Sequence, residues 1–510
     1  MNAAPWRLAR LLFGAWLAAW SGACTPTSPA GRTIVIVQAE GPRSLEPCES
    51  NEDHSANVLG NVFEPLVAMD ANLKLTPALA ASWYTPDATT WVFRLREGAR
   101  WHDGRAVTPA EVVASLERAR SDPRSRRRPE LSQVTHIAPG GAGEVVLTTR
   151  APLGALASQV AQVPVSRAAS VETRFPTGTG PYRIEGFTPG GDTLLVPARQ
   201  GAALHPLLFR VVPDAGARLR MLLDGRADVL PYLAADEAAR IDGSPKAKVL
   251  RRRGLLIAFL AMDYARPETP YVTRKENPFR DLRVRRALAS VIDREALLLE
   301  ALGGHGAPLT QMVVPEAFGY APGAPNPAPD LAAARALMAE AGLSGGFDVA
   351  LDFEGVAVEK SMASVVQVLS RQFARIGVRI KPQAHTTQQL LTRVESHDTS
   401  FYLLSWVGTS GDLGSTAEFL LRTPSEGRGT DNGGAYSSPE TDALLDAASA
   451  TLDPAARLAL LRRIEERVRL DVPVIPLLRR EDMYGTAAGV SFELRLDREI
   501  RGATLAVSRE

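Results

Sequence analysis

The chain has little cysteine, and this limits its covalent and metal chemistry. Its only cysteines are Cys24 and Cys48, and Cys24 lies in a leader-like segment. One remaining cysteine cannot form an intrachain disulfide, so Cys48 is expected to be a small buried side chain rather than a reactive thiol. The histidines are scattered, and none has the spacing of a metal cage. The sequence predicts no cofactor and no metal site made of side chains.

The chain also lacks an excess of one charge and, beyond its first thirty residues, a long apolar run. Its 58 basic and 57 acidic residues give a net charge of +1, so no overall field favours nucleic acid or an acidic surface. A membrane-spanning helix needs roughly eighteen or more apolar residues, and no later stretch reaches that length. We therefore expect local binding sites, no nucleic-acid partner and no spanning segment after the leader.

The first residues have the pattern of an export signal. Arg7 and Arg10 precede an apolar run, Leu11 to Trp20, and small residues lead to Cys24. We predict a signal peptide at residues 1–23 and a polar, proline-containing tether at residues 24–32. The segment resembles a bacterial lipoprotein signal, which implies acylation of the Cys24 thiol. Because Ser21 stands where leucine is usual, processing after Ala23 by ordinary signal peptidase is the alternative.

The densest run of local signals lies between Phe63 and Leu116. Trp91 to Leu95 alternates like a half-buried strand and is followed by turn residues. Thr108 can cap a helix, with Pro109 at its first position and Glu111 completing a capping box. This segment is therefore predicted to be a strand, a turn and a helix.

Further strand and helix patterns alternate along the chain and favour an α/β fold. The expected strands are 33–37, 144–148, 207–212, 227–230, 255–262, 347–353 and 378–380. The expected helices are 215–223, 331–341, 361–376, 439–448 and 454–468. Near residue 285 the arginines Arg283, Arg286 and Arg294 are expected to be structural and solvated.

Several sequence motifs follow one another along the chain in the order typical of one protein family. The first five are Phe63 to Leu66, Leu75 to Trp83, Thr90 to Gly98, Trp101 to Gly104 and Thr108 to Leu116. The later ones are Gly178 to Tyr182, Asn277 to Arg294, Asn432 to Pro439 and Asp471 to Leu477. Together they closely resemble the family 5 extracellular solute-binding proteins, the periplasmic oligopeptide- and dipeptide-binding components of ABC transporters.

The resemblance covers nearly all of the mature chain and implies a two-lobed α/β clamp with an extra domain, built from mixed sheets with flanking helices. It implies a first domain made of residues 33–62, 176–256 and 478–510. Residues 63–175 would form a second domain, and residues 257–477 a third domain that is the second lobe. At Gly178 and Gly180 we expect a sharp crossing between domains, because glycine allows positive φ angles.

The candidate ligand site lies between Trp406 and Leu413. The family pattern W-x-G-x-x-G-D-P places Asp412 on the acidic residue that meets a peptide's α-ammonium, and a charge-assisted bond suits that task. Ser410 and Gly411 precede it, and Trp406 is expected to stack on the ligand. Leu413 replaces the proline of the pattern, and a turn role for Asp412 is the competing interpretation. No motif selects an arginine for the ligand carboxylate.

An enzyme is not predicted. His102 and Asp103 resemble half of a catalytic pair, but they lie in the family's F-H-D-G turn, where a structural hydrogen bond is expected. The glycines near Gly178 lack the Lys-Ser/Thr that would follow them in a phosphate-binding loop.

The predicted function is capture of a peptide-like solute and its delivery to an ABC permease and ATPase. The alternative is the same fold binding a nickel chelate, an opine or a sugar. The resemblance implies an exported monomer, lipid-anchored on the periplasmic side of the inner membrane or on the outer face of the cell membrane.

Overall fold

The structure, a computed structural model, describes residues 32–170, 173–199, 203–323, 327–355, 360–425 and 427–508. The predicted signal peptide, nearly all of the tether, and Cys24 with its acylation lie outside the described residues. Within the described part, no helix is long and apolar enough to span a bilayer.

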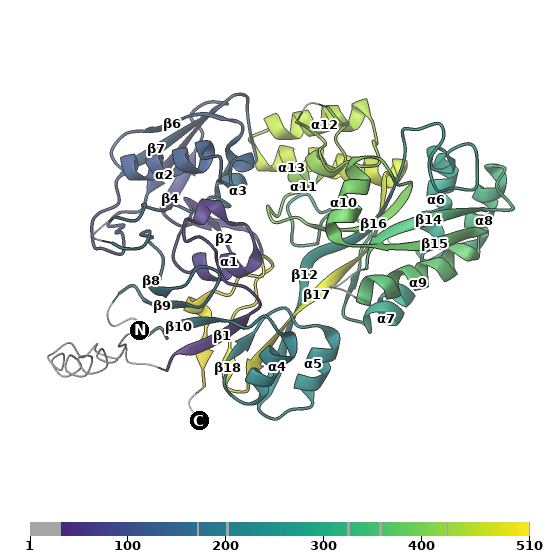
Figure 1. The fold of residues 1–510 in the computed structure, drawn as a ribbon. Helices are drawn as coiled ribbons and strands as arrows, with labels where there is room; N and C mark the ends of the chain where they lie inside the picture. Colours follow the sequence, from purple (N-terminus) through teal and green to yellow (C-terminus); the bar gives the residue numbers. More distant parts are fainter. Residues whose placement is uncertain are drawn as a thin grey trace, which may run out of the picture.

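Two long antiparallel strands join two lobes (Figure 1). They are β12, Ala247–Met262, and β17, Val474–Ala487. Their pairing shifts register between Arg253 and Ile257, so the ladder is interrupted where the strands pass from one lobe to the other. The strand expected at 255–262 is therefore the second half of a longer element.

Lobe 1 carries both ends of the described chain (Figure 1). Its strands are β1 Ile34–Gln38, β2 Val67–Met69, β3 Leu75–Pro77, β4 Ala80–Tyr84, β5 Thr90–Leu95, β6 Val134–Pro139, β7 Glu144–Thr149, β8 Tyr182–Phe187, β9 Thr193–Pro197, β10 Leu207–Val211, β11 Val229–Leu230, β18 Val490–Ser491 and β19 Ala506–Val507. Its helices are α1 Asp53–Leu59, α2 Pro109–Ser121, α3 Leu156–Val160, α4 Ala215–Leu223 and α5 Ala235–Asp242, with short 3-10 turns at Pro47–Glu49, Pro129–Leu131 and Gly502–Thr504.

Lobe 2 has fewer strands and more helix. Its strands are β13 Gly306–Pro308, β14 Phe347–Glu354, β15 Val378–His385 and β16 Phe401–Val407. Its helices are α6 Leu282–Val291, α7 Arg294–Leu302, α8 Leu331–Glu340, α9 Lys360–Ala374, α10 Thr387–Glu395, α11 Leu413–Leu420, α12 Pro439–Ala450 and α13 Pro454–Asp471, with a 3-10 turn at Pro278–Arg280. The strand predicted at 378–380 is wrong in length, because β15 continues to His385 along β14.

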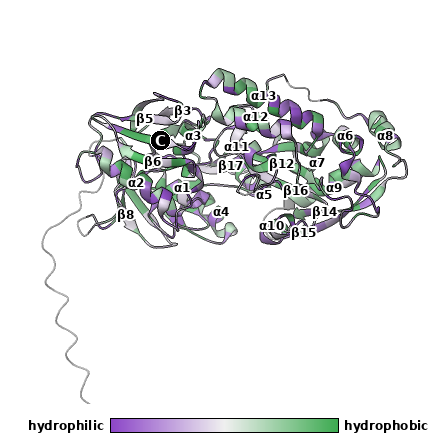
Figure 2. Cartoon of the chain, turned by 90° about the horizontal axis from the view of Figure 1, so that it is seen from above, coloured by the Kyte–Doolittle hydropathy of each residue, from purple (hydrophilic) through white to green (hydrophobic). Residues whose placement is uncertain are grey.

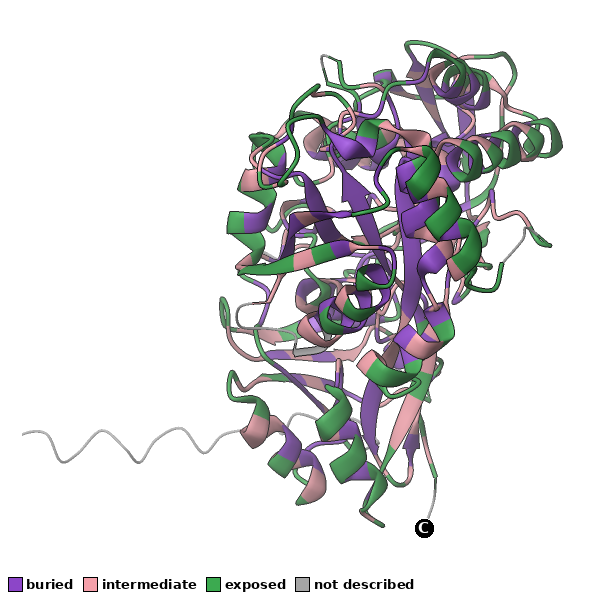
Figure 3. Ribbon diagram, turned by 90° about the vertical axis from the view of Figure 1, so that its right-hand side faces the viewer, coloured by how far each residue is buried: buried purple, intermediate pink, exposed green. Residues whose placement is uncertain are grey.

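One mixed sheet runs through both lobes in the order β15-β14-β16-β12-β17-β11-β1-β10-β9-β8. The pairs β1/β10, β14/β15 and β14/β16 are parallel, as expected where helices connect strands. In lobe 2 both faces of the sheet are covered, by one core around Phe401 and another around Tyr402. Figure 3 shows these strands buried behind helices whose outer faces are exposed. Figure 2 shows hydrophobic residues concentrated in the strands and hydrophilic ones on outer helices such as α13.

A separate four-stranded sheet, β4-β5-β7-β6, forms the outer part of lobe 1 with α2 and α3. The capping box that begins α2 is confirmed, since Thr108 Oγ1 accepts from Glu111 N at 3.3 Å and Thr108 N donates to Glu111 Oε2 at 3.0 Å. Phe93 and Trp101 are almost fully buried in this core. Burying one such side chain contributes roughly 1.5–3 kcal/mol.

The structure gives a different reason for two glycines and corrects the expectation for one arginine. Gly178 and Gly180 do not use the positive φ angles that glycine allows. Glycine fits there because the backbone of Val62 is close: a Cβ on Gly178 would lie 2.0 Å from Val62 O. Arg294 is not solvated but buried, with Nε donating to the carbonyls of Leu309 and Pro476. A buried guanidinium needs such acceptors, and the sequence around Arg294 does not reveal them.

Candidate functional site

The loop 408–412, between β16 and α11, lies at the boundary between the lobes. Gln162 of lobe 1 donates from Nε2 to Thr409 O at 3.2 Å. Gly411 has φ of 62°, and a Cβ on it would lie 2.8 Å from the Cβ of Leu73, another lobe 1 residue. Glycine is therefore required at 411 both by conformation and by close contact. Thr409 is exposed and Ser410 is half-buried, so this loop presents polar groups where the lobes meet.

Asp412 begins α11 and lies in a buried ion pair. Its Oδ1 accepts from Gly414 N at 2.7 Å, and Arg457 of α13 donates to both carboxylate oxygens, at 2.5 and 2.9 Å. Both side chains are only 6% exposed. A bidentate guanidinium–carboxylate pair of this kind is strong and fixes geometry. The cation that the structure places on Asp412 is thus Arg457, and contact of Asp412 with a ligand ammonium stays a prediction.

Trp406 lies at the end of β16, half-buried beneath α11. Its Nε1 donates to Thr416 Oγ1 at 3.3 Å, and its ring centroid is 6.0 Å from that of Phe419. Phe419 is 39% exposed, which is unusual for a large aromatic side chain on a helix of this lobe. The two rings form an aromatic surface beside the loop 408–412. Sequence reasoning selected Trp406 alone, because the apolar run at 419–421 reads as helix core.

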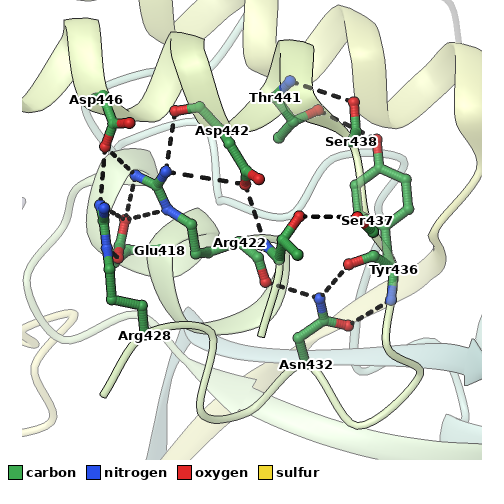
Figure 4. Close-up of polar contacts among 11 residues, drawn as sticks. Glu418, Arg422, Arg428, Asn432, Tyr436, Ser437, Ser438, Thr441, Asp442 and Asp446 are labelled. Atoms are coloured by element: carbon green, nitrogen blue, oxygen red, sulfur yellow. Dashed lines mark hydrogen bonds and ion pairs between the residues drawn. The ribbon is translucent and has the colours of Figure 1, made fainter. Parts of the chain in front are cut away.

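Hydrogen bonds and ion pairs hold the segment between α11 and α12 in place (Figure 4). Asn432 Nδ2 donates to the carbonyls of Arg422 and Tyr436, both at 2.8 Å, while its Oδ1 accepts from Tyr436 N at 3.0 Å. Arg422, 3% exposed, donates to Glu418 at 3.0 Å and to Asp446 at 2.7 Å. The spacing of Asn432 and Tyr436 in the sequence motif therefore corresponds to a turn, and this turn anchors α11 against α12.

The His102 turn is structural, as predicted. His102 Nε2 lies 3.0 Å from Gly180 O, and burial lowers the pKa of this imidazole. Asp103 does not contact His102 through its side chain but pairs with Arg105 and Arg167. Hydrogen bonds to these arginines outweigh burial and lower the pKa of the Asp103 carboxyl. The two residues therefore form no catalytic pair.

Cys48, His397 and Asp398 also have structural surroundings. Cys48 is buried, and burial raises the pKa of its thiol to about 11, which disfavours the reactive thiolate. His397 Nδ1 lies 3.2 Å from Gly433 O, and Asp398 pairs with Arg393 at 2.7 Å. Among the described residues, no three His, Cys, Asp or Glu side chains are grouped so that they could hold a metal ion.

A polar cavity of about 510 Å³ lies on β14 and β15 in lobe 2, apart from the loop 408–412. Its titratable groups already have partners. His385 Nε2 lies 2.7 Å from Asp352 Oδ1 within the lining, while Lys381 lies 3.3 Å from Asp348 and Arg393 lies 2.7 Å from Asp398, two carboxylates outside the lining. This neutralisation leaves no clear preference for a charged ligand.

Comparison with known proteins identifies the family. Residues 74–426 match the family described as bacterial extracellular solute-binding proteins, family 5 Middle. The chain is 26% identical over 474 residues to the glutathione-binding protein GsiB of Shigella dysenteriae, covering 88% of this chain and 89% of that protein.

Solved structures share the fold. HbpA2 from Haemophilus parasuis has a TM-score of 0.81 at 21% identity, covering 94% of this chain and 100% of that one. DppA from Helicobacter pylori in complex with the peptide STSA has a TM-score of 0.70 at 18% identity, covering 94% and 98%. NikA from Staphylococcus aureus in complex with Ni(L-His)2 has a TM-score of 0.69 at 18% identity, covering 94% and 100%.

The predicted fold and recognition are thereby confirmed. Motifs, two-lobed fold and family match agree over most of the chain. The chain belongs to the family 5 bacterial extracellular solute-binding proteins, and it is the solute-binding component of an ABC importer.

Proposed function

We propose that the solute is a short peptide-like molecule, bound between the lobes at the loop 408–412. The observation that carries this proposal is that this loop contacts lobe 1 through Gln162 and Leu73 while presenting the exposed Thr409. A solute bound there would touch both lobes, so it can favour the closed form by its greater affinity for that form. The names of the relatives GsiB and DppA, which bind glutathione and a peptide, support this chemistry.

The side chains around the loop suit a small amphiphilic ligand. The Trp406–Phe419 surface can pack against an apolar side chain or a peptide plane. Asp412, while paired with Arg457, is proposed to attract the ligand ammonium. Ser410 and Gly411 are proposed to shape the loop around the ligand. Because Arg457 already neutralises Asp412, the ammonium would bind at the edge of this pair rather than replace Arg457.

The alternative solute is a nickel chelate, because NikA with its bound nickel–histidine complex shares the fold. A chelate brings its own metal ligands, so it does not require a cage of protein side chains. An opine or a sugar would likewise use the aromatic surface and the polar loop.

The finer features of export and assembly are also proposals. We propose that Cys24 is acylated and anchors the protein on the periplasmic side of the inner membrane or on the outer face of the cell membrane. We also propose that the protein is a monomer. We propose the three-domain division of the sequence analysis, with residues 63–175 as the extra domain. No catalytic activity is proposed.

The test is thermal unfolding of the purified protein, stripped of solute, with glutathione, dipeptides, amino acids, sugars and nickel–histidine. A solute at about 100 times its Kd should stabilise the fold by about 2.7 kcal/mol and raise Tm measurably. The shift from glutathione or a dipeptide should be smaller in Asp412→Asn, which keeps the helix cap. Asp453→Asn is the matched control, because Asp453 caps α13 in the same way. If only sugars or chelates raise Tm, the peptide proposal is wrong.

A further inference from the structure

Another contact joins the lobes, apart from the long strands β12 and β17 and from the loop 408–412. It is made by the turn between α12 and α13, which Figure 1 shows beside α3 of lobe 1. Leu452 of this turn packs against the hydrophobic core of the β4–β7 sheet. Gly154 N of lobe 1 donates to Ser449 O at 2.7 Å.

The two backbones meet so closely here that a side chain at 154 is excluded. A Cβ on Gly154 would lie 2.2 Å from Thr451 O, and this oxygen belongs to backbone that cannot rotate away. The contact therefore combines an apolar residue inserted into the opposite lobe, a direct backbone hydrogen bond and a steric fit that needs glycine. We call this contact, formed by Gly154, Ser449, Thr451 and Leu452, the latch.

Arg457 joins the latch to the loop 408–412. Its Cδ would lie 3.0 Å from a Cβ at Gly154, so its stem packs beside the latch. Its Nε donates to Ala448 O at 3.1 Å, close to the end of α12. Its two remaining nitrogens donate to Asp412, and its guanidinium also lies 5.4 Å from the centroid of the Phe318 ring. One buried side chain thus contacts the latch at one end and the loop 408–412 at the other.

We propose that the latch holds the lobes at a defined separation, and that Arg457 is the positioning residue that couples the latch to the loop 408–412. Rigid, buried contacts of this kind have discrete arrangements rather than continuous ones, so a change at one end alters the other. The latch by itself sets only the lobe separation. The coupling through Arg457 deepens the proposed function and rests on it, because it requires the loop 408–412 to be the solute site.

Lobe separation is tested on the full chain without solute, by small-angle X-ray scattering and by distance measurements between spin labels on the two lobes. Leu452→Ala removes the inserted side chain, and Gly154→Ala introduces the clash with Thr451 O. Both are expected to broaden the distance distribution and raise the radius of gyration while the circular dichroism spectrum is unchanged. Leu299→Ala, at an exposed leucine of lobe 2, is the matched control and should change neither. Unchanged separation in both latch variants overturns the latch.

The coupling is tested by amide hydrogen exchange, which needs no solute. In Leu452→Ala, exchange should become several-fold faster in residues 408–412 as well as in 449–454. Arg457→Lys keeps the charge but loses the bidentate geometry, so it should speed exchange in 408–412. Faster exchange confined to 449–454 in Leu452→Ala refutes the coupling.

Glutathione titration of the same variants separates this inference from the proposed function. If the wild-type protein binds glutathione, Leu452→Ala should bind it more weakly, because more of the population is in forms that cannot close. An equal affinity in the two proteins would contradict the coupling. If the wild-type protein binds neither glutathione nor any dipeptide, the proposed solute is wrong, while scattering and exchange still decide the latch.

Discussion

Asp412 and Arg457 form a buried pair, so the losses of unfolding free energy caused by replacing each of them should not be additive. Each side chain is 6% exposed, and the two are joined by two bonds of 2.5 and 2.9 Å. Replacing Arg457 with alanine leaves an ionised carboxylate that retains only the bond from Gly414 N. Removing one partner of such a pair typically costs about 3–5 kcal/mol, because the remaining charge is buried and unpaired.

The double replacement gives the sharper expectation. Asp412→Ala also removes a helix cap, worth about 1 kcal/mol, so each single variant should lose a few kcal/mol. If the losses were independent, the double variant would lose about 6–10 kcal/mol. We expect it to lose only about as much as the worse single variant, because no charge is then left unpaired.

The assay is urea unfolding followed by circular dichroism and tryptophan fluorescence. A two-lobed protein can unfold in more than one step, so the midpoint of the transition that changes in Arg457→Ala is the quantity to compare. Trp406 lies near the pair and the other described tryptophans lie in lobe 1, so fluorescence helps to assign that transition. Strictly additive midpoint shifts in the double variant would refute the reasoning.

Three further variants test separate parts of the fold. Burial raises the pKa of Glu465 to about 8 from 4.5, so the folded chain keeps a proton that the unfolded chain releases, and stability should fall between about pH 4.5 and 8 by about 1.4 kcal/mol per unit. Glu465→Gln should flatten the plot of Tm against pH in that window, and an unchanged plot would contradict the assignment. Thr108→Ala should lower stability to urea by about 1 kcal/mol through loss of the capping box; no loss would mean that the cap is dispensable. Gly178→Ala should lower Tm by clashing with Val62 O, whereas Gly345→Ala, which meets no atom within 4 Å, should not; equal effects would refute the close-approach argument.

Elements whose signals are local could be predicted from the sequence. The helix from Pro109 was predictable because its cap, its first-turn proline and its capping glutamate are neighbours in the chain. The helix α4 was predicted with both of its bounds, Ala215 and Leu223, and it too begins at a local cap, Asp214. The helix predicted at 331–341 also begins with a local signal, since Asp330 caps α8 and its Oδ1 accepts from Ala333 N at 2.9 Å.

Elements determined by distant partners were predicted less well. The strand β15 extends to His385 because it pairs with β14 along its whole length, although its later residues are polar and largely exposed. The helix α10 was not expected at all, since its apolar face is limited to Leu390 and Val394, which pack against strands and loops distant in sequence. In both elements, tertiary packing determined the secondary structure although the local composition did not favour it.

In the candidate site, likewise, the residues of the local motif could be predicted and their partners distant in the sequence could not. The family pattern located the loop, and the structure places Trp406, Ser410, Gly411 and Asp412 together at the lobe boundary. Arg457, Gln162 and Phe419 were not predicted, because nothing in their local sequence distinguishes them from other side chains of their helices and loops.

A motif can assign a carboxylate to a position but cannot give its charge environment. Asp412 and Arg457 are 45 residues apart, and the arginine belongs to a helix whose sequence contains several others. The electrostatic role of Asp412 depends on which of those arginines faces it, and that choice is made by the packing of α13 against α11. An aspartate open to solvent would attract any ammonium, whereas one already paired attracts a cation only if the approach leaves the pair intact. Selectivity for a peptide-like solute would therefore come from the geometry that the Arg457 pair imposes on the loop 408–412, and not from the carboxylate alone.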